Sequence, residues 1–94
     1  MSNIKIKVSY AGRIADKLGR KAETLFFHEP VDVRTLMARI ADSSQPDGEE
    51  MFFVKKGSAR KPAVLTAVNG QVAGADVVLR DGDSVFFVQM VSGG

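Results

Sequence analysis

Cysteine is absent from the 94-residue sequence, and histidine occurs only once, as His28. Without cysteine the chain can form no disulfide framework, no thiolate metal site and no cysteine nucleophile. A single histidine excludes a metal site built from several histidines, and it leaves at most one base for a serine and histidine pair. We therefore expect no metal site, and any sulfur chemistry must use an atom other than a cysteine sulfur.

Long apolar runs and a strong net charge are also missing. The longest strictly apolar runs span only residues 51–54 and 85–88, too short to cross a bilayer. Lys5 and Lys7 interrupt the segment that would have to be a signal-peptide core. The 13 Lys and Arg against 11 Asp and Glu give a formal charge of +2, too small a field for a strong nucleic-acid binder. We expect a cytoplasmic protein that binds no membrane and no nucleic acid.

Alternation of apolar and polar residues predicts the strands. Residues 3–9 place Ile4, Ile6 and Val8 on one face, which is the period of a half-buried strand. Residues 21–28 are predicted to form a strand that could pair with the first as a hairpin. Residues 62–68 are another predicted strand, with a short return at 71–73 after the Asn69-Gly70 turn. The last predicted strand is residues 84–90, which follow the Asp81-Gly82-Asp83 turn.

One segment has the periodicity of an amphipathic helix. Asp32 is a suitable N-cap, and the apolar residues that follow it form one stripe: Val33, Leu36, Met37, Ile40 and Ala41. Arg34 and Arg39 fall off this stripe and should face water. A shorter helix is expected within residues 11–19, loops at 43–50 and 55–61, and a buried segment at 51–54. One helix with one apolar stripe covers one sheet, which predicts a two-layer α+β domain.

The last predicted strand is apolar on both of its faces. Val85 and Phe87 lie on one side, while Phe86, Val88 and Met90 lie on the other. A sheet covered by a helix on one face leaves its second face open to water. Apolar residues on that open face favour a partner-binding surface.

Other candidate sites have simpler structural interpretations. Asp81 and Asp83 could be paired catalytic carboxylates, but around Gly82 they are more typical turn formers. The Phe pairs at 26–27, 52–53 and 86–87 could stack on nucleic-acid bases. Adjacent strand residues point to opposite faces, however, so each pair should place one ring in the core and only one outward. His28 is interpreted as a strand-end residue, and we expect no autonomous active site.

The end of the sequence, Val91-Ser92-Gly93-Gly94, is its most unusual feature. Glycines lack a Cβ atom, so such a tail can be extended through a narrow cleft to present the Gly94 carboxylate in the active site of another protein. That carboxylate could attack the α-phosphate of ATP to form an acyl adenylate, which a sulfur or nitrogen nucleophile then displaces. The plain alternative is a frayed end.

In its last third the sequence resembles the MoaD/ThiS-type sulfur carriers among the ubiquitin-like β-grasp proteins, a group that includes the small subunit of molybdopterin synthase and the thiamin-pathway carrier. The resemblance lies in Ala67-Val68-Asn69-Gly70, in Leu79-Arg80-Asp81-Gly82-Asp83-Ser84-Val85-Phe86-Phe87, and in Val91-Ser92-Gly93-Gly94. It implies a β-grasp fold over residues 1–90, with a mixed sheet packed on one main helix, parallel first and last strands, and a flexible tail at 91–94.

The resemblance also implies a function. An ATP-dependent E1-like activating enzyme would adenylate Gly94 and convert it to a thiocarboxylate, with Gly93 threading the tail into the enzyme. The surface that docks on this enzyme and on a sulfur-accepting synthase subunit would comprise Phe86, Val88, Met90, Val91 and Ser92. The chain itself would be a carrier and not an enzyme, it would bind no cofactor, and ATP would be used by its partner.

Molybdopterin is the favoured destination of the sulfur. Molybdopterin synthase members of the group often carry Pro-Pro where this chain has Gln89-Met90, so a thiamin-type or amino-acid pathway stays open. A ubiquitin-like modifier conjugated through Gly94 is an alternative of another class, as is a plain interaction domain.

Overall fold

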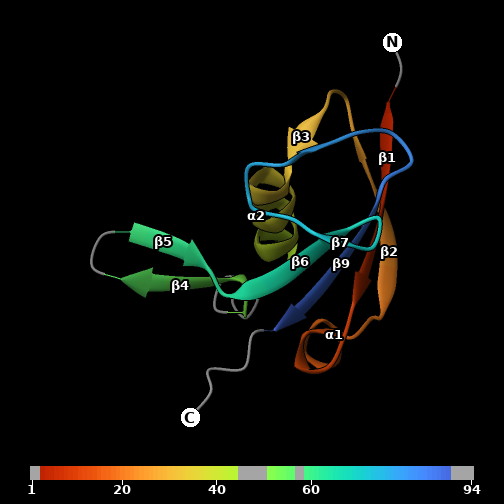
Figure 1. Ribbon diagram of the computed structural model, residues 1–94. Helices are drawn as coiled ribbons and strands as arrows, with labels where there is room; N and C mark the ends of the chain where they lie inside the picture. Colours follow the sequence, from red (N-terminus) through yellow and green to blue (C-terminus); the bar gives the residue numbers. More distant parts are fainter. Residues whose placement is uncertain (1–2, 45–50, 57–58, 90–94) are drawn as a thin grey trace.

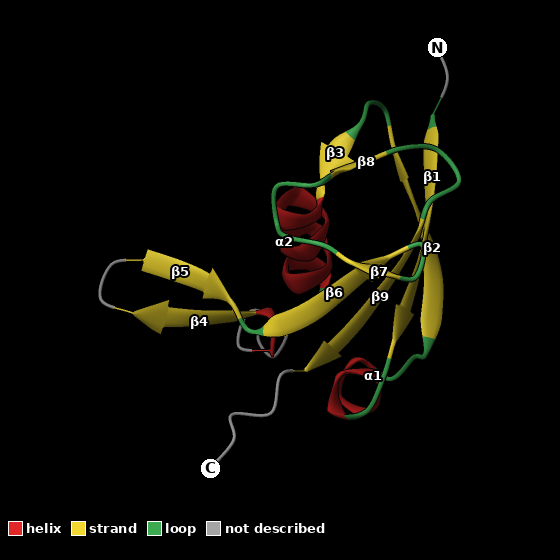
Figure 2. Cartoon of the chain, in the orientation of Figure 1, coloured by secondary structure: helices red, strands yellow, loops and turns green. Residues whose placement is uncertain are grey.

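The structure, a computed structural model, describes residues 3–44, 51–56 and 59–89. Its elements follow in the order β1 (Ile4–Tyr10), α1 (Arg13–Leu18), β2 (Ala22–Phe27), β3 (Val31–Asp32), α2 (Val33–Ser43), β4 (Phe53–Lys56), β5 (Ala59–Pro62), β6 (Val64–Val68), β7 (Gln71–Val72), β8 (Val78–Leu79) and β9 (Ser84–Gln89). Figure 1 and Figure 2 show two layers, in which α2 lies across one face of the main sheet. The predicted α+β architecture is confirmed.

The main sheet has five strands in the order β2-β1-β9-β6-β7. β1 and β9 run parallel to each other at its centre, as expected, with Val8 opposite Val85 and Tyr10 opposite Phe87. β2 pairs antiparallel with β1, which confirms the predicted hairpin, and β6 pairs antiparallel with β9. The strand that leads to the chain's end is therefore held on both sides.

The main helix begins where the sequence predicts. The Asp32 carboxylate accepts a hydrogen bond of 2.8 Å from the backbone N–H of Thr35, which satisfies one of the free amide groups of the first turn. All five residues of the predicted stripe are buried. Arg34 and Arg39 are exposed as expected, and the Arg39 guanidinium lies 4.9 Å from the centre of the Phe27 ring.

Phe87 connects the two layers of the core. Its side chain is fully buried, it stacks on Tyr10 with ring centres 6.3 Å apart, and it meets the edge of Phe52 at 5.3 Å. Burying one such side chain contributes about 1.5–3 kcal/mol. The apolar segment around Phe52, far from β9 in sequence, is thereby fixed against the last strand.

The loop predicted at 55–61 is wrong. β4 and β5 form an antiparallel hairpin in which Lys55 is opposite Arg60, and Figure 1 shows the hairpin projecting away from the main sheet. The sequences of β4, FVKK, and of β5, ARKP, do not alternate between apolar and polar residues, so periodicity gives no strand signal for them. The strand predicted at 62–68 is interrupted at Ala63, because Pro62 ends β5 and Val64 begins β6.

The prediction that each Phe pair places one ring outward is also wrong for one pair. Phe52 and Phe53 are both buried. Phe52 is helical and Phe53 begins β4, so the alternation of a single strand does not apply to them. The segment at 51–54 was expected to be buried, and this is confirmed for residues 51–53.

Candidate docking face beside the last strand

β9 carries the chain toward its C-terminal segment along a fixed path. Gln89, the last described residue, lies opposite Val64 of β6, and Val88 lies opposite Leu65. On the other side of β9, the backbone N–H of Ala11 donates to the carbonyl of Phe87 at 3.1 Å. The predicted site residues Met90, Val91, Ser92, Gly93 and Gly94 lie outside the described residues. The division into a domain at 1–90 and a tail at 91–94 therefore stays a prediction.

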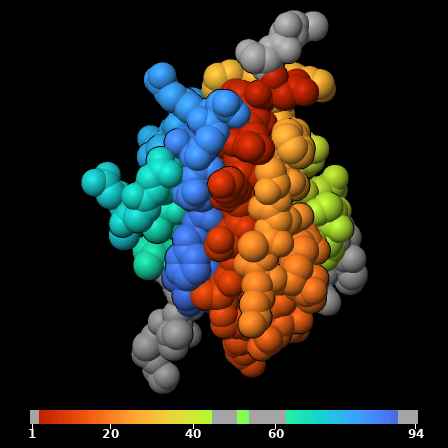
Figure 3. All heavy atoms as spheres, turned by 90° about the vertical axis from the view of Figure 1, so that its right-hand side faces the viewer, coloured from red at the N-terminus to blue at the C-terminus, as the bar shows by residue number. Residues whose placement is uncertain are grey.

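The alternation predicted for the last strand is confirmed. Val85 and Phe87 are buried, whereas the side chain of Phe86 is 42% exposed and that of Val88 is half-buried. Phe86 and Val88 thus lie on the sheet face that α2 does not cover. This face is turned toward the viewer in Figure 3, where β9 (blue) lies between β1 (red) and β6.

Three neighbours extend this pair into a patch that spans three strands. Leu65 is opposite Val88, Ala67 is opposite Phe86, and Val72 of β7 is opposite Ala67. Directly opposed residues share a face of the sheet, and Leu65 and Val72 are 43% and 73% exposed. We call these five residues the open-face patch. Sequence reasoning missed the β6 and β7 members, because only the register between β6 and β9 brings them beside Phe86.

A cationic strand borders the open-face patch. Lys5, Lys7 and Ser9 occupy the outward positions of β1, with Lys7 opposite Ser84 and Ser9 opposite Phe86. An apolar centre with charges at its border is the usual anatomy of a protein interface. The sign of this border favours a partner surface that carries acidic groups.

The Asp81-Gly82-Asp83 segment is a turn, as predicted. The Asp81 carboxylate accepts from the backbone N–H of Lys5 at 2.8 Å, and the Asp83 carboxylate accepts from the backbone N–H of Arg80 at 2.8 Å and from the Asn69 amide at 3.0 Å. These bonds tie the start of β9 to β1 and to the Asn69-Gly70 turn. Both carboxylates have structural partners.

Tyr10, Arg20 and Glu23 form a polar cluster at the end of the core. The Tyr10 hydroxyl donates to the Glu23 carboxylate at 2.5 Å, which also accepts from Arg20 Nε at 2.7 Å. Burial, followed by the hydrogen bond to Glu23, raises the pKa of Tyr10 well above its ordinary value. The hydrogen bond to Glu23 raises the pKa of Arg20. A hydroxyl held protonated in this way is a donor and not a nucleophile, so the cluster stabilises the fold.

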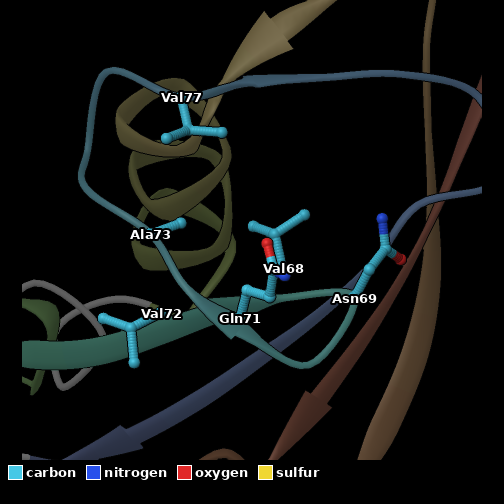
Figure 4. Close-up of a pocket in the computed structure, with 6 residues that line it drawn as sticks. All are labelled: Val68, Asn69, Gln71, Val72, Ala73 and Val77. Carbon is cyan, nitrogen blue, oxygen red and sulfur yellow. The ribbon is translucent and has the colours of Figure 1, made fainter.

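An open cavity of about 450 Å³ lies beside the β6–β7 hairpin (Figure 4). Its lining consists of Val68, Asn69, Gln71, Val72, Ala73 and Val77. No ionisable side chain lines it, and the Asn69 amide is already used, because it donates to Asp83 and accepts from the backbone N–H of Ser84. This lining offers no acid, base or nucleophile.

The remaining candidates lie apart from the open-face patch. His28 directly follows β2, as predicted for a strand-end residue. It is exposed, with Nδ1 3.2 Å from the side-chain oxygen of Asn3. Within residues 3–44, 51–56 and 59–89, no three His, Cys, Asp or Glu side chains come together in a way that could hold a metal ion. In the same ranges no helix has the length and apolar character needed to cross a membrane.

Comparison with known proteins places this geometry in a known group. The model of the ThiS family matches residues 8–94. No curated protein matches the chain. Among solved structures, a Pyrococcus furiosus protein named as molybdopterin converting factor, subunit 1, is 28% identical, with 94% of this chain and 99% of that chain covered and a TM-score of 0.74.

Two further structures share the fold. Urm1 from Trypanosoma brucei is 26% identical over all of both chains, with a TM-score of 0.73. Small archaeal modifier protein 1 from Methanosarcina acetivorans is 18% identical over all of both chains, with a TM-score of 0.79. The fold is the ubiquitin-like β-grasp that the resemblance implies.

Proposed function

The chain belongs to the ThiS family of ubiquitin-like sulfur carriers, and from this membership we propose that it carries sulfur as a thiocarboxylate on Gly94. The match of the family model through residue 94 is the observation that supports this most directly. It covers the Gly-Gly pair and the whole of β9, which β1 holds as far as Phe87 and β6 holds as far as Gln89.

The proposed chemistry uses the α-carboxylate of Gly94. A carboxylate oxygen attacks the α-phosphorus of ATP, pyrophosphate leaves, and an acyl adenylate forms. A hydrosulfide or an equivalent sulfur nucleophile then attacks the acyl carbon, AMP leaves, and the thiocarboxylate remains. An E1-like activating enzyme supplies the ATP site and the catalytic groups, so in this proposal the chain is a carrier and not an enzyme. Because activation consumes ATP, we place the protein in the cytoplasm.

The absence of cysteine agrees with this chemistry. The sulfur is bound to the C-terminal carbonyl carbon, so the carrier needs no thiol of its own. Two glycines at the end leave the backbone narrow enough to enter a confined active site. In the proposal Gly93 threads this cleft and Gly94 reaches the reacting atoms.

The open-face patch is the proposed docking surface for both partners. It places Phe86 and Val88 on the strand that leads into the tail, so a protein bound there has the tail within its reach. Met90, Val91 and Ser92 are expected to extend the contact. The activating enzyme and the sulfur acceptor would use the same surface, and hence they would bind one after the other.

The proposed acceptor is a synthase subunit of molybdopterin formation. The 28% identity to a protein named as subunit 1 of molybdopterin converting factor supports this destination and a second subunit as the partner. Thiamin-type and amino-acid pathways share every step as far as the thiocarboxylate. The small archaeal modifier, at 18% identity, shows only the shared fold, so conjugation to lysine is an outcome to be tested.

The test is a probe that reacts selectively with thiocarboxylates, applied to the protein isolated from its host and combined with intact mass. Mass alone is ambiguous, since exchange of oxygen for sulfur adds the same nominal mass as oxidation of one of the four methionines. We expect a reactive species that is lost when Gly94 is deleted and kept in Lys17→Ala, an exposed position of α1 that leaves the tail and the open-face patch unchanged.

Each other outcome has a definite meaning. A chain that never reacts with the probe under any growth condition contradicts the carrier function. Adducts that resist thiol reductants, depend on ATP and require Gly94 would indicate a modifier. A chain that shows no ATP-dependent change would be an interaction domain.

A further inference from the structure

β2 leaves one long edge of the main sheet open. The strand order places β2 and β7 at the two edges, and β7 has two residues whereas β2 has six. No strand among the described residues pairs with the outer side of β2. Figure 3 shows β2 (orange) beside β1 (red) with no further strand beyond it.

The hydrogen-bonding pattern identifies the groups that face outward. The backbone N–H of Tyr10 donates to the carbonyl of Lys21 at 2.8 Å. Antiparallel pairs alternate between bonded and non-bonded positions. In the register of β1 and β2, the backbone groups of Glu23, Leu25 and Phe27 therefore face β1. Those of Ala22, Thr24 and Phe26 face away from it.

This edge lacks most of the usual protections against strand pairing, and its one inward-pointing charge, Glu23, is paired with Arg20 of the same chain. Exposed edges in natural proteins are typically short, bulged, or interrupted by lysine or proline. The sequence of β2, AETLFF, contains neither of these residues, and its register with β1 runs through six successive pairs without a bulge. Ala22 and Thr24 are exposed, and Phe26 is 56% exposed. An extended strand can therefore join the sheet here.

We propose that this strand is β2 of a second copy of the chain. An antiparallel pairing about a twofold axis at Thr24 places Thr24 opposite its own copy and Ala22 opposite Phe26 of the second copy. Thr–Thr pairs and a large ring against a small side chain are compatible cross-strand neighbours, and no like charges meet. Glu23, the one charged residue of β2, is held by Arg20 of its own chain at 2.7 Å.

Such a dimer leaves the open-face patch available. That patch lies on β9, β6 and β7, and β1 separates it from β2. Pairing along a single strand buries less area than a permanent dimer requires, so the association should be weak and dependent on concentration. The proposal is independent of the chemistry at Gly94.

The first experiment is sedimentation velocity of the full chain over a wide range of concentration. We expect the wild type to shift from monomer to dimer. Thr24→Pro should remain monomeric at every concentration, because it removes an outward N–H that β1 does not use and proline is tolerated on strand edges. Thr24→Lys should weaken the dimer by placing like charges opposite each other. Thr35→Lys, which adds the same charge on an exposed position of α2, should behave as the wild type.

The second experiment uses the absence of native cysteine. In the proposed pairing the two Thr24 residues form a hydrogen-bonded pair, whose Cα atoms lie about 5.5 Å apart, within the range of about 4.4–6.8 Å that a disulfide spans. Thr24→Cys should cross-link under mild oxidation, and Thr35→Cys should not. This readout does not require the proline variant to fold.

Two results would overturn the proposal. One is a wild-type chain that stays monomeric at all concentrations and a Thr24→Cys variant that fails to cross-link. The other is a dimer that survives Thr24→Lys and is lost in Phe86→Asp, since this would assign the self-association to the open-face patch.

Discussion

Phe86 and Phe87 are consecutive in β9, but their rings lie on opposite faces of the sheet. Phe87 is fully buried between the sheet and the segment around Phe52, whereas Phe86 is 42% exposed beside Ala67. The first ring belongs to the folding core and the second to the candidate docking surface. Adjacent positions therefore allow stability and docking to be changed separately.

Phe86→Asp should weaken binding to the activating enzyme by about tenfold or more, because a carboxylate would be forced into an apolar contact. Titration calorimetry with the host's activating enzyme measures this effect. Phe26→Asp is the matched control, since Phe26 is exposed on the same face but on β2, outside the open-face patch. Equal affinities of the two variants would contradict the assignment of the patch.

Phe87→Ala should lower the free energy of unfolding by about 3–5 kcal/mol, because it leaves a cavity between Tyr10 and Phe52. Urea denaturation measures this change. Phe86→Ala, the same substitution on the exposed ring, should cost no more than about 1 kcal/mol. Similar losses in both variants would show that the two rings are equally important for the core.

The elements with a buried face are those that the sequence predicts well. β1, α2 and β9 each place apolar side chains on one side at the period of their secondary structure, and the Asp32 cap and the Asn69-Gly70 turn are set by local hydrogen bonding and positive φ angles. These signals are contained within a few residues. The fold class follows from them.

Features that depend on contacts across the sequence could not be predicted. β3 and β8 are two-residue strands that pair with each other, with Val31 opposite Leu79, although more than forty residues separate them in the sequence. The β4–β5 hairpin has no alternation of apolar and polar residues in its sequence. Leu65 and Val72 become part of the candidate site only through the register of β6 with its neighbours. The sequence therefore identified the strand that carries the site but not the extent of the patch.

Asp32→Ala should destabilise the protein by about 1 kcal/mol at neutral pH through loss of the N-cap of α2. The hydrogen bonds from Thr35 lower the pKa of Asp32 below its ordinary value of 3.8. A carboxyl group whose pKa is lower in the folded state stabilises the fold at pH values above its unfolded-state pKa. This contribution is lost as the pH falls through its folded-state pKa.

The stability difference between the wild type and Asp32→Ala should thus shrink as the pH is lowered below 3.8. Denaturation curves at a series of acidic pH values test this. Asp42→Ala is the control, because Asp42 is exposed near the end of the same helix, where a carboxylate gains nothing from the helix dipole. A difference that grows on acidification would contradict the capping role.

Tyr10 is the only tyrosine in the chain, so its ionisation can be followed by ultraviolet absorbance without interference from others. Burial and the Glu23 hydrogen bond raise its pKa well above the ordinary value of 10.0. An acidic group whose pKa is raised by folding stabilises the folded state at pH values below its unfolded-state pKa. This contribution is lost as the pH rises above that unfolded-state pKa. We therefore expect tyrosinate absorbance to appear above pH 10 only together with unfolding, as monitored by circular dichroism.

Glu23→Gln removes the charge and should allow Tyr10 to ionise at lower pH. Ionisation near pH 10 in a folded wild-type chain would show that the Tyr10 hydroxyl is not held by Glu23.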